Sequence, residues 1–147
     1  MHENYSGSVV PGVSMTLTVT PAGGGAPSTI TWTFAPTYVH ASALTLLAGS
    51  WTMPGGSVAS ISSSGVIAAH DAATGCTISG QVSDSDTTVN LYNVTATYTG
   101  CTGGAAALNG VALSGLGTLD NSVVPTRFYV GLRSSNKKTM SGLSWTR

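Results

Sequence analysis

The chain has 147 residues, of which 7% are charged and 41% are hydrophobic, and its formal net charge is zero. A chain of this length fits one domain with a substantial hydrophobic core. Intrinsic disorder is excluded because it accompanies low hydrophobicity and high net charge, whereas the mean hydropathy here is positive.

The charges are segregated along the chain. The acids are Glu3, Asp71, Asp84, Asp86 and Asp120, and the bases all follow them: Arg127, Arg133, Lys137, Lys138 and Arg147. The bases are dispersed among apolar residues, and so few charges give only a small counterion-release effect. We therefore expect no nucleic-acid partner. There is also no apolar run of about 18 residues, so no transmembrane helix is predicted.

The N-terminus, MHENYSGS, is polar and lacks the charged and apolar regions of a signal peptide. We interpret residues 1–8 as a flexible segment preceding the body of a single β domain over residues 1–147. Composition and cysteine content favour an exported protein whose leader is not part of these residues.

The first predicted strands alternate apolar and polar residues with a period of two, which is typical of β-strands. Val13–Thr20 (VSMTLTVT) places four apolar side chains on one face, and Ile30, Trp32 and Phe34 share a face in TITWTFA. The two runs predict a hairpin joined by PAGGGAP. Tyr38–Ala48 is the best helix candidate, as one or two turns, and a further strand is the alternative.

The remaining predicted strands are short and separated by glycine, proline, serine and aspartate. They include both runs between the cysteines, and also Gly49–Met53, Ser57–Ser62, Val66–Ala69, Leu108–Leu119, Arg127–Arg133 and Thr139–Trp145. The glycines of Leu108–Leu119 indicate a bulge or a bend. The expected fold is all-β: an up-and-down antiparallel barrel, or a barrel-like sandwich, of about eight to ten strands.

Residues 75–101 (GCTISGQVSDSDTTVNLYNVTATYTGC) begin and end near the only two cysteines. An antiparallel hairpin turning near Asp86–Thr88 would bring Cys76 and Cys101 together at its open end. A bond between them would stabilise the fold by roughly 3.5 kcal/mol in the chain-entropy model. Such bonds persist outside the reducing cytosol. Two buried free thiols are the alternative, and no C-x-x-C or zinc spacing is present.

No catalytic motif, cofactor site or metal site is predicted. His70 and Asp71 are the best candidates for hydrolytic chemistry, but neighbours on a strand point to opposite faces. Asp84 and Asp86 offer oxygens for calcium, but the full ligand loop is missing and turn preference explains both. Trp32, Trp51 and Trp145 are candidate ligand-stacking or barrel-closing aromatics, and a core role is the alternative.

Two resemblances follow from these motifs. Gly49-Ser50-Trp51 resembles the G-x-W of calycin barrels (lipocalins, avidins and bacterial inhibitors of secreted metalloproteases), which implies a tryptophan packed across a barrel end. From about Leu47 to Arg147 the chain resembles small uncharacterised secreted or lipid-anchored proteobacterial proteins, Burkholderia among them. The residues that carry this second resemblance are Gly49, Trp51, Gly75, Cys76, Gly80, Tyr92, Val94 and Cys101. It implies export, an all-β fold and exposure as a surface antigen.

The expected function is that of a non-enzymatic binding or structural module of the bacterial envelope or medium. It would be located in the periplasm, on the outer-membrane surface or outside the cell. Its partner would be a small apolar ligand, a glycan or a protein, and membrane attachment would occur only through a removed or lipidated N-terminus. One alternative is a calycin-type protease inhibitor that uses a free segment, Met1–Ser8. A hydrolase of unknown specificity is the other.

Overall fold

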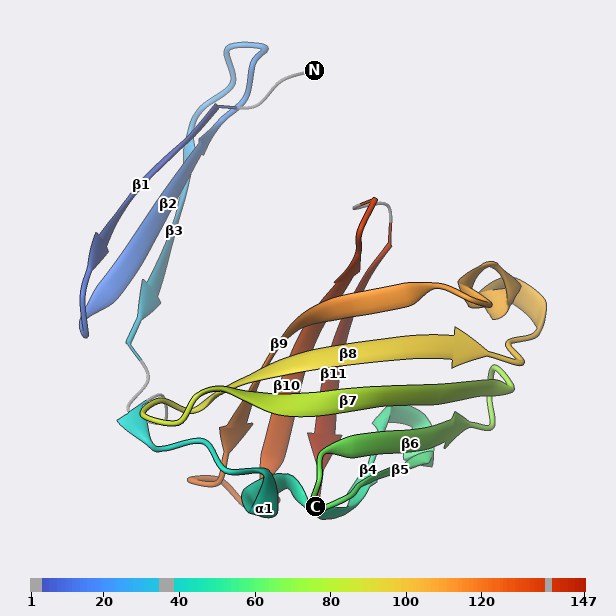
Figure 1. Ribbon diagram of the computed structural model, residues 1–147. Helices are drawn as coiled ribbons and strands as arrows, with labels where there is room; N and C mark the ends of the chain where they lie inside the picture. The colour runs from blue at the N-terminus through green and yellow to red at the C-terminus, as the bar shows by residue number, and fades with distance from the viewer. Residues whose placement is uncertain (1–3, 35–38, 137–138) are drawn as a thin grey trace. The chain divides into compact units, whose positions relative to one another are not determined.

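The computed structural model describes residues 4–34, 39–136 and 139–147. These residues form antiparallel strands in two sheets, which confirms the predicted all-β class (Figure 1). The chain divides into two compact units, residues 1–36 and 37–147, where the sequence predicts a single domain. The reason is the strand pairing, because the first three strands pair only with one another.

The N-terminal unit is a three-stranded sheet in the order β1-β2-β3, with β1 at Asn4–Val10, β2 at Ser14–Thr20 and β3 at Ser28–Thr33. The β2–β3 pair is the hairpin that the alternation predicts. Residues 4–8 were expected to belong to a flexible segment, but they lie in β1, which pairs with β2 along its whole length. Residues 1–3 lie outside the described residues.

The C-terminal unit is a closed up-and-down barrel in the order β10-β11-β4-β5-β6-β7-β8-β9. Each strand pairs with its neighbours in the chain, and β11 closes the barrel on β4 through Thr146 and Thr52. The short connections between predicted strands account for this meander. The strands are β4 Gly49–Thr52, β5 Val58–Ile61, β6 Val66–Asp71, β7 Cys76–Asp86, β8 Leu91–Thr99, β9 Ala112–Asp120, β10 Arg127–Ser134 and β11 Met140–Thr146.

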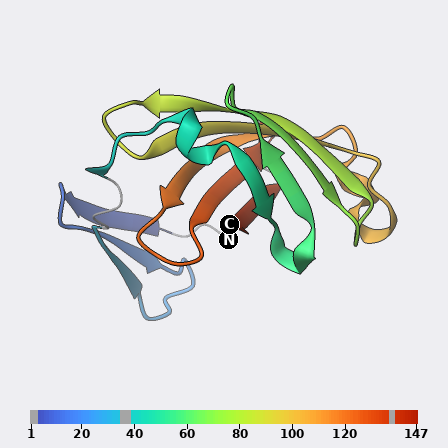
Figure 2. The ribbon, with the colours of Figure 1, turned by 90° about the horizontal axis from the view of Figure 1, so that it is seen from below.

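Large apolar side chains fill the barrel interior. Phe128 lies at the centre of an aromatic cluster, with ring centroids 6.0 Å from Trp51, 5.8 Å from Tyr92 and 5.9 Å from Trp145. The strands curve around this interior in the view from below (Figure 2). An eight-stranded barrel has just enough room for such side chains, so the interior is a packed core.

Helical structure is brief. The segment predicted as one or two helical turns contains one, α1 (Leu44–Leu47), while Tyr38 lies outside the described residues. Among the described residues, the 3-10 helices η2 (Pro54–Gly56) and η3 (Gly103–Leu108) connect strands. Within the described parts of the chain, no helix has the length and apolarity to cross a membrane.

The glycine-rich run Leu108–Leu119 was predicted to contain a bulge or a bend, and it turns before β9 begins but contains no bulge. Strand β9 begins only at Ala112, and its register with β8 and β10 runs without a bulge; the irregularity in the barrel lies in β7, between Asp84 and Asp86. Gly117 is needed for packing instead. A Cβ at this position would lie 2.7 Å from Cζ of Phe128, so the glycine makes room for the central ring of the core.

We predict that Gly117→Ala lowers the free energy of unfolding by about 1–3 kcal/mol, the usual cost of overpacking a core. Gly142→Ala is the matched control, because a Cβ there would meet nothing within 4 Å. The control should remain within about 0.5 kcal/mol of the parent chain in urea unfolding followed by tryptophan fluorescence. Equal stabilities of the two variants would contradict this account of the core.

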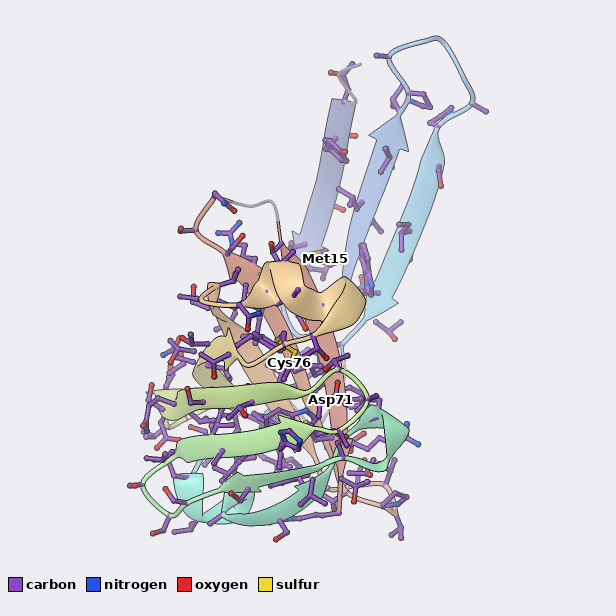
Figure 3. The ribbon with its side chains drawn as sticks, turned by 90° about the vertical axis from the view of Figure 1, so that its right-hand side faces the viewer. Met15, Asp71 and Cys76 are labelled. Carbon is purple, nitrogen blue, oxygen red and sulfur yellow. A yellow bond between two sulfur atoms is a disulfide. The ribbon has the colours of Figure 1, made fainter. Side chains whose placement is uncertain are left out.

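The structure confirms the disulfide between Cys76 and Cys101, which are 25 residues apart. Both cysteines are buried, at the open end of the predicted β7–β8 hairpin (Figure 3). Beside the bond, the side-chain amide of Asn109 donates to the carbonyl of Cys101 and accepts from its backbone N–H, both at 2.8 Å. The disulfide and this amide together hold the end of the hairpin.

Candidate functional site

Trp51, from the G-x-W motif, is buried in the barrel core beside α1. Its Nε1 donates to the carbonyl of Leu47 at 2.8 Å, and the guanidinium of Arg147 lies 4.5 Å from its ring centroid. Arg147 also donates to the carbonyl oxygens of Ala48 (2.8 Å) and Leu46. The residue after the last strand therefore ties the first barrel strand to α1.

We predict that Arg147→Ala destabilises the barrel by about 1–2 kcal/mol, because it removes charge-assisted hydrogen bonds and a cation–π contact at an exposed position. The stability of Arg147→Lys should lie between those of the parent and the alanine variant. An ammonium group retains the charge but cannot donate to both carbonyl oxygens as the planar guanidinium does. The measurement is the urea midpoint of the three proteins. An alanine variant as stable as the parent would remove this role.

The other tryptophans lie in different environments. Trp145, on β11, is 2% exposed and belongs to the aromatic cluster, and its Nε1 meets no acceptor among the described residues. Trp32, on β3 of the N-terminal sheet, is 42% exposed. Of the three, Trp32 alone is positioned to stack on a partner from solution.

The candidate hydrolytic pair lies at the end of β6. His70 is exposed, and the Asp71 carboxylate accepts hydrogen bonds from Ser57 Oγ (3.2 Å), the Ala73 N–H (3.0 Å) and Thr74 Oγ1 (2.7 Å). The bonds from Thr74 and Ala73 are the main reason why the pKa of Asp71 is lowered. Asp71 therefore stabilises the β6–β7 turn beside Cys76 (Figure 3).

The acidic pair considered for calcium lies where β7 ends. Asp86 Oδ1 accepts from the N–H and the hydroxyl of Thr88, and these bonds lower its pKa. Asp84 lies opposite Tyr92 on the neighbouring strand β8. Burial of the Tyr92 side chain raises its pKa. In residues 4–34, 39–136 and 139–147, no group of three or more histidine, cysteine or acidic side chains is arranged to hold a metal ion.

The N-terminal sheet has one apolar face. Its strand register aligns apolar side chains in three rows, because alternate residues of a strand point to the same side. The rows are Tyr5–Val19, Leu17–Ile30 and Val9–Met15–Trp32. We call these seven residues the apolar face; Met15, on the central strand, is labelled in Figure 3.

Five members of the apolar face are exposed. The exposed fractions are 63% for Tyr5, 67% for Val9, 44% for Met15, 44% for Ile30 and 42% for Trp32. Residues 4–34 consist of the three strands and their connections, so the described part of this unit has no second layer to cover the face. Exposed apolar patches of this kind mark interaction sites in soluble proteins.

The opposite face of the same sheet carries hydroxyls. Ser8 and Thr16 hydrogen-bond across strands at 2.8 Å, and Thr18 and Thr29 do so at 3.0 Å. No charged residue occurs between positions 4 and 34. The sheet is therefore amphipathic without being ionic, and the hydroxyl face supplies its contact with water.

A small hollow lies at the end of the apolar face where β1 turns into β2. Its volume is about 170 Å³, and Val9, Val13, Met15, Trp32 and Phe34 contribute to its lining. The Phe34 N–H donates to the carbonyl of Val13 at 2.7 Å, which extends the β2–β3 ladder to this edge. The hollow is large enough for one or two protruding side chains.

The barrel has a second surface of interest on the outside of β9, β10 and β11. Two adjoining hollows of about 530 and 600 Å³ share Leu116, Gly131 and Gly142. The glycines leave the side-chain layer open, and the half-exposed Leu116 and the partly exposed Tyr129 flank it. This groove has fewer exposed apolar side chains than the apolar face.

Sequence reasoning found part of the apolar face and missed the rest. The alternation of β2 and β3 identifies Met15, Leu17, Val19, Ile30 and Trp32. It missed Tyr5 and Val9 because Gly7 interrupts the apolar alternation of β1 between them. The signal available was the hydrophobic pair Val9–Val10 before the turn at Pro11-Gly12.

The fold and these surfaces define an all-β protein that combines a packed eight-stranded barrel with an amphipathic three-stranded sheet. No protein-family model, no curated protein and no solved structure matches the chain.

Proposed function

We propose that the chain is a non-enzymatic binding protein and that the apolar face of its N-terminal sheet receives a protein partner. The observation that carries this proposal is the alignment of seven apolar side chains in cross-strand rows, five of them substantially exposed. A flat, uncharged surface of this kind fits another apolar protein surface better than it fits a small ligand, which is usually held in a concave site.

The barrel supports this proposal by what occupies its interior. Trp51, Tyr92, Phe128 and Trp145 fill the space where a barrel of this size would hold one small ligand. The barrel then acts as a rigid, disulfide-stapled body, and the contacts with partners lie on outer surfaces.

Export remains part of the proposal. A buried disulfide that links neighbouring strands is the type of bond that persists in the periplasm or outside the cell. The same location would make the protein accessible as a surface antigen. Resemblance to secreted or lipid-anchored proteobacterial proteins points in the same direction.

The two alternatives have less support. The protease-inhibitor hypothesis depends on a free segment at Met1–Ser8, and residues 4–8 are paired in β1. The hydrolase hypothesis depends on His70 and Asp71, and the Asp71 carboxylate is engaged by Ser57, Ala73 and Thr74. No specific observation favours either over a binding role.

We predict that the chain binds an uncharged apolar dye such as Nile red and that Met15→Lys reduces this binding severalfold. The substitution places a charge on the central strand of the apolar face, between Val9 and Trp32, and a dye that binds there would have to desolvate this charge. The measurement is dye fluorescence at a low protein concentration, with the circular dichroism spectrum as a check on folding.

Thr31→Lys is the matched control, because Thr31 is an exposed position on the hydroxyl face of the adjacent strand. It adds the same charge to the same sheet and should leave dye binding unchanged. Equal dye binding by the parent and both variants would remove the apolar face as the binding surface.

A further inference from the structure

The apolar face has a size and chemistry suited to a particular partner. A large side chain has an accessible area of roughly 200 Å², and the five exposed residues are each about half exposed, so together they present on the order of 500 Å². Two such faces packed together would bury about 1,000 Å², the lower bound for a specific protein interface. The buried area therefore meets this lower bound only when the partner's surface is equally apolar and equally flat.

The face is also compatible with a copy of itself. Because residues 4–34 carry no charge, two copies meet without like-charge repulsion and without desolvating an ion. Sheets pack face to face about 10 Å apart, with inward side chains interdigitating.

We infer that the partner of the apolar face is a second copy of this chain, and that two N-terminal sheets form a six-stranded β-sandwich around a two-fold axis. This inference rests on the proposed binding role of the face and names its occupant. A two-fold axis makes the contact isologous, so the assembly closes at two chains. The hydroxyl faces then form the outside of the sandwich.

Edge pairing is the competing way for two such sheets to associate. β1 and β3 are the edge strands of this sheet, and edge strands invite pairing between chains. Edge pairing would extend the sheet and leave the apolar side chains in water, whereas face-to-face packing removes them from it. The hydrophobic gain therefore favours the sandwich.

The test is sedimentation velocity of the whole chain over a wide concentration range, for the parent, Met15→Lys and Thr31→Lys. We expect a reversible monomer–dimer equilibrium for the parent and for Thr31→Lys. Met15→Lys should weaken the dimer by a hundredfold or more, because an unpaired charge would be buried in the interface. A circular dichroism spectrum unchanged by the substitution shows that the sheet still folds.

Two results overturn the inference. The first is a parent chain that stays monomeric over the whole concentration range. The second is a Met15→Lys chain that dimerises as well as the parent, because this result would place the contact on an edge strand or on the groove of β9–β11. A monomeric parent that still binds dye through Met15 leaves the proposed binding role intact and removes only the second copy as its partner. If Met15→Lys also leaves dye binding unchanged, both the proposed binding role and the second copy as partner are removed.

Discussion

The structure depends on one constraint, the period-two alternation of side chains along a strand. In the C-terminal unit the sheet closes on itself, so every inward residue reaches a common core around Phe128. In the N-terminal unit the same alternation operates in an open sheet of three strands, so one whole apolar side has no second layer formed by the described residues 4–34. Closure accounts for the sealed core of one unit, and its absence leaves the other with an exposed apolar face.

The chain also carries few charges, since only 7% of its residues are charged. A barrel whose outer surface carries serine, threonine and glycine is hydrated through hydroxyls and backbone groups, and it needs few ions to remain folded. Three of the ionisable side chains stabilise local structure through hydrogen bonds or a cation–π contact. Asp71 and Asp86 hold the turns at either end of β7, and Arg147 holds the end of the barrel beside Trp51. Their positions at turns and ends explain why so few charges suffice.

Much of the fold could be predicted from the sequence, because alternation and turn residues are local signals. They identified ten of the strands, the meander and the Cys76–Cys101 bond. The role of Gly117 could not be predicted, because it depends on where the Phe128 ring from another strand is placed. The separation into two units was missed for a similar reason, since alternation says which side of a strand is apolar and not which strands it will pair with. The exposure of Trp32, in contrast with the burial of Trp51 and Trp145, depends on that pairing and could not be read from composition.

The central claim is that the N-terminal sheet does not cover its own apolar face, while the barrel aromatics are sealed. Hydroxyl-radical footprinting with mass spectrometry tests it directly, because methionine and tryptophan are readily oxidised when they are accessible. In dilute protein we expect rapid labelling of Met15 and Trp32 and little labelling of Trp51 and Trp145. Slow labelling of Met15 and Trp32 in dilute, monomeric protein would show that the chain covers this face itself, and it would contradict the account.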